Sequence, residues 1–578
     1  MSQRHWYRRV VKVLFGVATM LAACGDTLVD HRAPAALLEL EASCQEGLQS
    51  CGTGCFPDSD LICDRATCEV CRAPAQAEPR CEDTRCTFVC VGGTRQCGDR
   101  CVAESVVACG SSCALCPEPE NGLGDAVCVP GAALGAGQCD ITCDLGFHLC
   151  GSSCLEETAQ SCGTACVDCS GSIPAHATAV CSAVHTCDFA CNPGFLRCDT
   201  GCCGVTQVAT GADFTCAVSN EGGLFCWGRN DMGQLGEGST TAQPNPVMVF
   251  PSGAQVTRVS AGATHACAIA AGALYCWGNN ASGQLGMDST AAGLEPALVA
   301  LPGVTEVAVG GYLEAVASPV PHGHTCAVTA AHAVYCWGDN ARGQLGLGDL
   351  GSRTVPTLVS GLSAATGADA IALGARHSCV RTASGGVACW GERTVGQVGD
   401  GMASVQPALA PVTVRLSGVG ALAVGERHGC LTDISGGDPE LLCFGSDAEG
   451  QIGADGPSYV TSPTAPSVGG GLSSARPNLV AAGRAHTCLL RLGDIGGLKC
   501  LGANNQGQLA LPASGELGAV SDVALPATNL PQAIAAGGDH SCALLADGEL
   551  YCWGDNRHGQ LGDGTTTSRF DPAPIVSP

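Results

Sequence analysis

The feature that most constrains this chain is a unit that recurs seven times between about residue 205 and the C-terminus. One copy reads GGDHSCALLADGELYCWGDNRHGQLGDGT over residues 537–565, and the copies follow one another every 51 to 59 residues. Each copy holds short apolar runs separated by glycine-rich turns, and none has a convincing helical periodicity. A repeat of this length built from short β-type runs predicts a propeller or a solenoid.

Every copy has the same order of runs. A Val/Ala/Gly run such as TEVAVG is followed by a G-x-x-H turn, a second run, a tight turn and the letters C-W-G. An Asn/Asp-rich loop, G-Q-L-G and a Pro/Val run complete the copy. Small side chains in the first run suit a strand crowded around a central axis. This order therefore predicts four strands per copy, which is one blade of a propeller.

The pattern resembles the regulator of chromosome condensation repeat family, whose members form seven-bladed propellers. The resemblance rests on the histidine turn, the C-W-G step and the G-Q-L-G loop, which are His265, His324, His377, His428, His486 and His540; Trp227, Trp277, Trp337, Trp390 and Trp553; and residues 233–236, 283–286, 343–346 and 559–562. The departures are Phe214 for histidine, Phe444 and Leu501 for tryptophan, and Val398, Ile452 and Ala510 in the loop. The resemblance implies an all-β, seven-bladed β-propeller over residues 204–578. A cysteine two residues after the histidine is more similar to an exported bacterial lipoprotein branch than to eukaryotic members.

Fourteen cysteines of the repeats fall into seven local pairs. Cys542 and Cys552 flank the three-residue loop Ala546-Asp547-Gly548, whose glycine stands where such a loop wants a left-handed residue. This loop places the two cysteines opposite each other on antiparallel strands, within reach of a disulfide. The expected pairs are Cys216 and Cys226, Cys267 and Cys276, Cys326 and Cys336, Cys379 and Cys389, Cys430 and Cys443, Cys488 and Cys500, and Cys542 and Cys552.

The 43 cysteines of the chain are too many for an ordinary reduced cytosolic protein and indicate an oxidising compartment. Twenty-eight of them lie in residues 44–203, in repeats that start at Cys51, Cys97 and Cys150. Units of about 50 residues bury little core, so we expect a mostly irregular region that is stapled by disulfides. Three C-x2-C pairs in it are interpreted as parts of disulfides rather than as zinc ligands. The spacing leaves the connectivity open.

The N-terminus has the layout of an export signal. Four basic residues lie in 1–12, and a short apolar stretch, residues 13–23, ends in Leu-Ala-Ala before Cys24. This ending resembles a bacterial lipobox, which predicts a signal peptide over residues 1–23, lipidation of Cys24 and a tether over residues 24–43. Ordinary cleavage and a twin-arginine signal are alternatives. Gly25 after the cysteine resembles the outer-membrane class, so we expect an exported protein held at the outer membrane or cell surface by its lipid anchor alone.

Composition excludes several classes of function. The formal net charge of −26 argues against a nucleic-acid groove. No uninterrupted apolar run of 18 residues occurs, which argues against a polytopic membrane protein. The repeated histidines are interpreted as satisfying backbone groups at the turns, and the tryptophans as packing. No motif for catalysis, phosphate binding or a cofactor stands out, so we expect a monomeric protein that is not an enzyme and holds no cofactor or metal.

One face of the propeller is the expected site of a partner. An insertion, Tyr312–His322, lies in the loop between the first and second strands of its blade, and the Asn/Asp-rich loops share that face. Expanded hairpins at 433–441 and 491–498 lie on the other face. The candidate partner residues are Tyr312, Glu314, His322, Asp231, Asp339 and Asp555. The acids of these loops fit Asx turns or, alternatively, calcium.

Three functions remain open for this face. The first is binding of an extracellular protein or polysaccharide by a cell-surface lipoprotein, the second is inhibition of an extracellular enzyme, and the third, with little residue support, is a propeller enzyme. Loops on a rigid scaffold often carry binding, but a fold alone does not fix a function. We therefore expect a non-enzymatic binding protein.

Overall fold

A computed structural model gives the structure of the chain. It describes residues 48–577 except for 52–53, 58–61, 65–68, 71, 83–84, 93, 98–99, 104–107, 110–113, 116–123, 131–136, 146, 151–152, 157, 163–165, 183, 314–320, 363–366, 415–416, 455–456, 468–475, 494–496, 513–518 and 526–528. The predicted signal, Cys24 and Glu314 lie outside the described residues. The chain divides into two compact units, Met1–Cys143 and Asp144–Pro578. Nowhere in the described ranges is a helix long and apolar enough to cross a membrane.

The described part of the first unit consists of antiparallel two-stranded hairpins. They are β1 (Leu48–Cys51) with β2 (Gly54–Pro57), β3 (Ile62–Asp64) with β4 (Glu69–Val70), β5 (Ala77–Glu82) with β6 (Arg85–Cys90), β7 (Thr94–Cys97) with β8 (Arg100–Ala103), β9 (Ala108–Cys109) with β10 (Ala114–Leu115), and β11 (Gly124–Pro130) with β12 (Gly137–Cys143). A disulfide between Cys90 and Cys101 joins β6 to β8. It links the last cysteine of one repeat to the second cysteine of the next.

The second unit begins with the last cysteine-rich repeat. Its elements are β13 (Phe147–Cys150) with β14 (Ser153–Glu156), the 3-10 helix η1 (Cys169–Ser172), β15 (Ala177–Cys181) with β16 (Cys187–Cys191), and β17 (Leu196–Cys198) with β18 (Gly201–Cys203). Its disulfides are Cys150–Cys166, Cys162–Cys181, Cys169–Cys187, Cys191–Cys202 and Cys198–Cys203. Cys191–Cys202 again joins the last cysteine of one repeat to the second of the next. The repeats are therefore stapled across their boundaries as well as within them.

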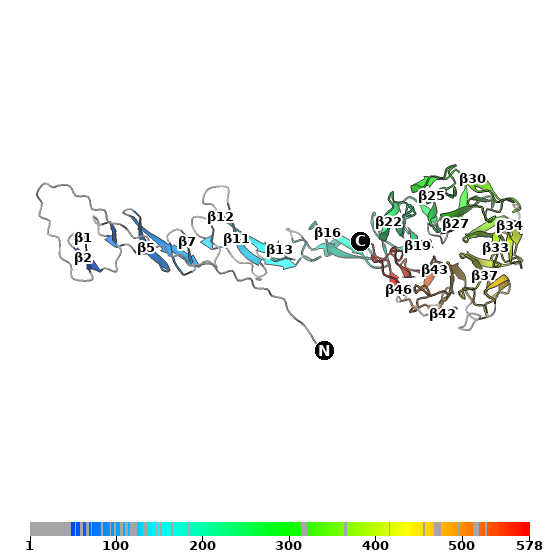
Figure 1. Cartoon of the computed structure of the whole chain (residues 1–578). Coiled ribbons are helices and arrows are strands. Elements are labelled where there is room, and N and C mark those ends of the chain that lie inside the picture. The colour runs from blue at the N-terminus through cyan, green and yellow to red at the C-terminus, as the bar shows by residue number, and fades with distance from the viewer. Residues whose placement is uncertain are drawn as a thin grey trace, which may run out of the picture. The chain divides into compact units, whose positions relative to one another are not determined.

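The rest of the second unit is the predicted seven-bladed propeller (Figure 1). Blades 1 to 3 are β19 (Val205–Thr210), β20 (Phe214–Ser219), β21 (Leu224–Gly228), β22 (Gln243–Phe250); β23 (Val256–Ala261), β24 (His265–Ala270), β25 (Ala273–Gly278), β26 (Gly293–Leu298); and β27 (Val304–Leu313), β28 (Pro321–Thr329), β29 (Val334–Gly338), β30 (Arg353–Leu358). Blade 4 is β31 (Ala368–Leu373), β32 (His377–Thr382), β33 (Val387–Arg393) and β34 (Ser404–Thr413). Blades 5 to 7 are β35 (Val419–Val424), β36 (His428–Asp433), β37 (Glu440–Ser446), β38 (Tyr459–Thr464); β39 (Leu479–Ala482), β40 (His486–Leu490), β41 (Leu498–Gly502), β42 (Ala519–Asp522); and β43 (Pro531–Ala536), β44 (His540–Leu545), β45 (Leu550–Gly554), β46 (Arg569–Pro574).

A disulfide joins the second and third strands of every blade. The seven bonded pairs are those expected from the sequence, each with 4.1 Å between its Cα atoms. In blade 7, Cys542 lies directly opposite Cys552, and Gly548 has a φ of 91°. The three-residue loop therefore sets the register that brings the cysteines together.

Neighbouring blades are joined by the residues that recur in the repeats. The Trp553 ring nitrogen donates to the Gln508 carbonyl of the preceding repeat at 3.0 Å, and four other tryptophans make the same bond. The predicted partner of the histidines was wrong. His486 Nε2 lies 2.8 Å from the Ser541 hydroxyl of the next blade, not on a backbone group, because the turn points the ring across the blade interface. The same bond forms at His265, His324, His428 and His540.

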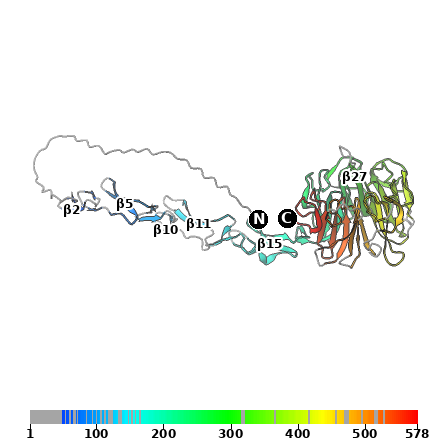
Figure 2. The ribbon, with the colours of Figure 1, turned by 60° about the horizontal axis from the view of Figure 1, so that its bottom comes forward.

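The ring closes without a shared strand, because every blade is one continuous segment. At the seam between blades 7 and 1, Trp227 donates to the Gln560 carbonyl at 3.0 Å, and His540 lies 2.9 Å from the Thr215 hydroxyl. Figure 2 shows the same ring tilted, with the blades standing side by side around it. The inter-blade bonds at this seam are therefore the same as at the others.

The cysteine-rich repeat adds a second closure, which we call the clasp (residues 191–205). Leu196 is fully buried in one cluster with Trp227, Leu550 and Ile575. Gly194 donates to the Ile575 carbonyl at 2.8 Å and accepts from the Leu550 amide at 3.0 Å. The clasp therefore packs on blade 1, blade 7 and the C-terminal segment together.

Candidate binding face

Two sets of connections lie at one end of the blades. In blade 7 they are the turn 537–539, between the first and second strands, and the loop 555–568, between the third and fourth strands. The Asp555 amide donates to the Asp539 carbonyl at 2.9 Å, so the turn and the loop are in contact. We call this end of the propeller, with the equivalent turns and loops of all blades, the loop face.

A central channel of about 510 Å³ opens at this face. Its wall is made by the first strand of each blade. These strands are rich in the small residues Ala, Gly and Val, as predicted from the sequence. Asp213, Glu426, Arg484 and Asp539 line its mouth in the turns of this face, and Arg258 and Glu306 line it further along the first strands. Burial raises the pKa of the Glu426 carboxyl, and the charges of Arg484 and Arg427 offset part of that rise.

The insertion in blade 3 lies at the same mouth. It was expected to be a loop, but β27 and β28 extend into it, and Tyr312 lies opposite His322 in the strand register. A loop was expected because the sequence there breaks the repeat, whereas backbone pairing simply continues past it. The two rings stack with their centroids 4.8 Å apart, and the Arg376 guanidinium lies 4.0 Å from the centroid of the Tyr312 ring.

The structure brings the insertion together with one of the predicted acids. His322 Nδ1 lies 3.4 Å from the Asp339 carboxylate, which comes from a third-to-fourth strand loop. Asp339 also accepts from the Ala341 amide and from Gln344. The two sets of candidate residues therefore share the loop face.

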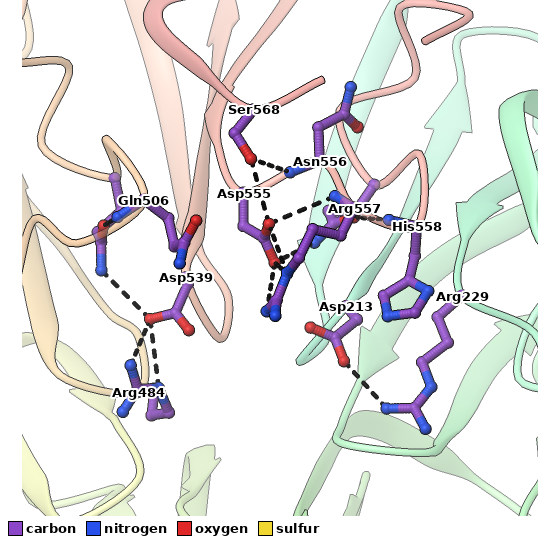
Figure 3. Close-up of polar contacts among 12 residues, drawn as sticks. Asp213, Arg229, Arg484, Gln506, Asp539, Asp555, Asn556, Arg557, His558 and Ser568 are labelled. Carbon is purple, nitrogen blue, oxygen red and sulfur yellow. Dashed lines mark hydrogen bonds and ion pairs between the residues drawn. The ribbon is translucent and has the colours of Figure 1, made fainter. Parts of the chain in front are cut away.

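The other predicted acids hold their own loops. Asp555 is fully buried and accepts from Arg557, Gln560 and Ser568 (Figure 3). Burial raises its pKa, but the bonds and charge of Arg557 outweigh this, so the pKa is lowered and the carboxylate stays ionised. Asp231 pairs with Arg229 and lies on the surface. Donors of the chain already occupy these carboxylates, which favours the Asx-turn interpretation over calcium.

An asparagine organises each typical loop. Asn230 Oδ1 accepts from the Leu235 amide at 3.0 Å, and its Nδ2 donates to the carbonyls of Ser239 and Thr241 at 3.1 Å. This satisfies the backbone of an irregular loop with one side chain. The recurring asparagine in W-G-x-N therefore has a structural role.

The possible metal groups within the described ranges fall on cysteines that form disulfides. Cys150, Cys162, Cys166, Cys169, Cys187, Cys198 and Cys203 supply most of their ligand atoms. Cys166 and Cys169, one of the C-x2-C pairs, are bonded to Cys150 and Cys187 respectively. Disulfide sulfurs are not thiolates, so this pair is a structural staple. The other two C-x2-C pairs include residues outside the described ranges.

Sequence reasoning missed the arginines of the loop face. Arg376, Arg427 and Arg484 lie in the turns between first and second strands, and Arg342 and Arg557 lie in the loops between third and fourth strands. They escape a search for repeated motifs because each occupies a position that varies from blade to blade. The signal in the sequence that could have found them is their place in the turns and loops that the repeat order puts at one end of the blades.

Comparison with known proteins identifies the fold family. The RCC1-like domain matches residues 188–489, which is more than half of the chain. The chain belongs to the RCC1 family. The Regulator of chromosome condensation (RCC1) repeat also matches residues 532–560 and 547–578.

Curated RCC1-like relatives match the propeller. Ultraviolet-B receptor UVR8 of Arabidopsis thaliana is 28% identical over 64% of this chain and 81% of its own length. The E3 ubiquitin-protein ligase HERC2 of Homo sapiens is also 28% identical, over 63% of this chain but only 7% of its own length. The X-linked retinitis pigmentosa GTPase regulator of Mus musculus is 35% identical over 24% of this chain, and this match spans 13% of the regulator.

Solved structures agree on the fold. Yeast RCC1 (Prp20), in a complex with Kap60, has a TM-score of 0.52 at 21% identity and covers 64% of this chain and 85% of its own. A second structure of Prp20p from Saccharomyces cerevisiae gives a TM-score of 0.51. At this identity, the likeness supports the fold alone.

Proposed function

We propose that this protein is an exported, non-enzymatic binding protein, anchored at the outer membrane or cell surface through a lipidated Cys24, whose loop face contacts another protein. The export signal and lipobox-like ending of residues 1–24 support the location. The many disulfides support an oxidising compartment.

The observation that carries the binding role is the raised hairpin of blade 3. Among the described residues, only this blade extends its first two strands, to Leu313 and from Pro321, beyond the shared turn. The extension presents the stacked Tyr312 and His322 beside the channel mouth, whereas the repeated histidines and tryptophans are committed to joining blades. Aromatic and arginine side chains on a rigid support are typical of the centres of protein interfaces.

Relatives support a protein partner at a coarser level. Yeast RCC1 was solved bound to the protein Kap60, and Prp20p was studied for its binding to Gsp1p and histones. Those are properties of the relatives. For this chain they favour protein interaction over catalysis, and the extracellular partner is our proposal.

The test is cross-linking of the full-length protein on the cell that makes it, followed by mass spectrometry. Three chains are compared: the natural protein, a variant with residues 312–322 replaced by a short Gly-Ser linker, and a control with the hairpin 433–441 replaced. We expect one protein to be captured by the natural chain and the control but not by the linker variant. Equal capture by all three folded chains would refute the role of the loop face.

The anchor is tested separately. Cells are fed a fatty-acid analogue that can be tagged, and Cys24→Ser is compared with the natural chain. We expect label on the natural chain alone and release of the variant from the membrane fraction. A natural chain without label would refute lipidation.

A further inference from the structure

In the ion pairs of the loop face, the two side chains differ in how much of each is exposed to solvent. In four of them the arginine is exposed and its acid is not: 61% against 0% for Arg557 and Asp555, 43% against 18% for Arg484 and Asp539, 51% against 10% for Arg342 and Glu392, and 44% against 3% for Arg569 and Asp563. The reverse holds for Asp231 with Arg229 and for Asp349 with Arg353. Among the candidate acids, Asp555 therefore lies beneath a guanidinium, whereas Asp231 does not.

Three exposed arginines lie in successive blades of the loop face, and one of them, Arg484, lines the channel mouth. Arg427 belongs to blade 5, Arg484 to blade 6 and Arg557 to blade 7. We call these three residues the arginine arc. Figure 3 shows Arg484 beside Asp539 and Arg557 folded against Asp555 at the seam between blades 7 and 1. Arg427 donates to the Thr394 hydroxyl at 3.2 Å.

Acids that are less exposed hold two of the three arginines, Arg484 and Arg557, in place. Asp555 holds Arg557 through Nε at 3.0 Å and Nη2 at 2.9 Å, and Asp539 holds Arg484 through Nε at 3.2 Å and Nη2 at 2.6 Å. Each bond uses one edge of a planar guanidinium, and the remaining N–H groups of an exposed side chain are left toward solvent. Arg484 and Arg557 are therefore preorganised donors whose geometry matches carboxylates, and Arg427 on blade 5 adds a third exposed guanidinium.

We propose that the arginine arc is the contact surface for an acidic peptide segment of the protein partner, bound across the channel mouth through its Asp and Glu side chains. This rests on the proposed function of the loop face and names the chemistry of its partner. The peptide is favoured over a polysaccharide because the nearby aromatic ring, Tyr312, already stacks on His322 and Arg376 rather than standing free as a sugar platform.

The overall charge opposes this partner only at long range. The chain carries −26 formally, which would repel an acidic segment as it approaches. At physiological ionic strength, charges separated by more than about 8 Å are largely screened. Groups in direct contact therefore decide the binding. On blades 5 to 7 the exposed ones are Arg427, Arg484 and Arg557, with the less exposed Glu426 and Asp539 between them.

The experiment uses fluorescein-labelled octaglutamate, octalysine and polygalacturonate as probes, with fluorescence anisotropy on the purified full chain. The test variant carries Arg427→Gln, Arg484→Gln and Arg557→Gln. The control carries Arg476→Gln and Arg491→Gln, two exposed arginines in connections at the opposite end of the propeller. Thermal unfolding establishes that both variants are folded, and Arg427→Gln alone, which disturbs no ion pair of Asp539 or Asp555, is measured as well.

We expect octaglutamate to bind the natural chain, the test variant to bind about tenfold more weakly, since exposed ion pairs each contribute modestly, and the control to be unchanged. Arg427→Gln should weaken binding by a smaller factor in the same direction. The proposal is overturned if octaglutamate does not bind, if the test variant binds equally, or if octalysine or polygalacturonate binds more tightly. Any of these outcomes would leave the role of the loop face standing, because the cross-linking with the 312–322 variant tests that role without reference to charge.

Discussion

The clasp makes a prediction about where the propeller opens. Leu196 is fully buried between Trp227 of blade 1, Leu550 of blade 7 and Ile575 near the C-terminus. Leu196→Ala removes the side chain that both ends of the ring share, and it leaves a cavity among large neighbours that are held by their own blades. Replacing a fully buried leucine by alanine costs about 2–5 kcal/mol.

The loss should be local to the seam. The Val205 amide donates to the Gly548 carbonyl at 2.8 Å, and the Leu550 amide donates to the Gly194 carbonyl at 3.0 Å, so both bonds break when the clasp lifts. Native-state hydrogen exchange of the full chain measures the opening. A cost of 2–5 kcal/mol corresponds to about 30- to 4000-fold less protection at these two amides. Amides of β32, in blade 4, should change little, because partial opening need not involve the whole fold.

Leu298→Ala is the matched control, because it makes the same substitution at an exposed side chain of β26. It should change protection by less than about 0.5 kcal/mol everywhere. The reasoning is refuted if Leu196→Ala behaves like this control. It is also refuted if protection falls equally in all seven blades, since the clasp would then act on the global fold rather than on the seam.

Three further predictions concern the repeated residues. Gly483→Ala should unfold blade 6 in a thermal melt, because a Cβ there would lie 2.3 Å from a histidine ring and 2.4 Å from a carbonyl oxygen, whereas Gly436→Ala meets open space and should be neutral. The six repeat histidines are fully buried, which lowers their pKa to about 3, or about 4 for the last of them, from 6.5. Below pH 6.5 the unfolded chain therefore binds more protons than the folded chain. The free energy of unfolding is highest above that pH and falls toward pH 4, by up to about 1.4 kcal/mol per pH unit for each histidine. A Tm that is flat between pH 7.5 and 5 would contradict this. His377→Phe should reduce the fall of Tm with falling pH. The double substitution Cys379→Ala and Cys389→Ala should lower the free energy of unfolding by about 3 kcal/mol, measured by denaturant unfolding.

The propeller was predictable because its signals are local and repeated. Seven copies of the same runs fix the number of blades, and a three-residue loop fixes which cysteines lie opposite each other. The histidine was harder to predict, because its partner is a hydroxyl on the next blade rather than a group in its own turn. Each blade that departs from this histidine–hydroxyl bond is explained by the residue that it faces on the next blade. Phe214, which needs no partner, precedes a blade with Ala266 at the hydroxyl position, and His377 faces Gly429, so it lacks the bond that the other histidines make.

The clasp and the disulfides before it were not predictable, because they are contacts between segments far apart or between successive repeats. Leu196 and Ile575 are separated by most of the propeller sequence, and neither belongs to the repeated pattern. Cys191 and Cys202 form a disulfide although the cysteine spacing assigns them to different repeats. Sequence periodicity describes what is equivalent between units, and such contacts join positions that are not equivalent.

On the loop face, repeated residues and single-copy residues have different roles. A residue that recurs in every blade is explained by what every blade needs, and Asn230 and Trp553 indeed serve the loop and the blade interface. Asp555 was a natural candidate for a partner because acids recur in these loops, yet recurrence is the reason it is buried and bonded within the chain. A partner is bound once, by one face of the whole ring, so it must be distinguished by residues that occur once. The Tyr312–His322 hairpin and the arginine arc are single-copy features on that face, and this is why they, rather than the repeated acids, define the proposed site.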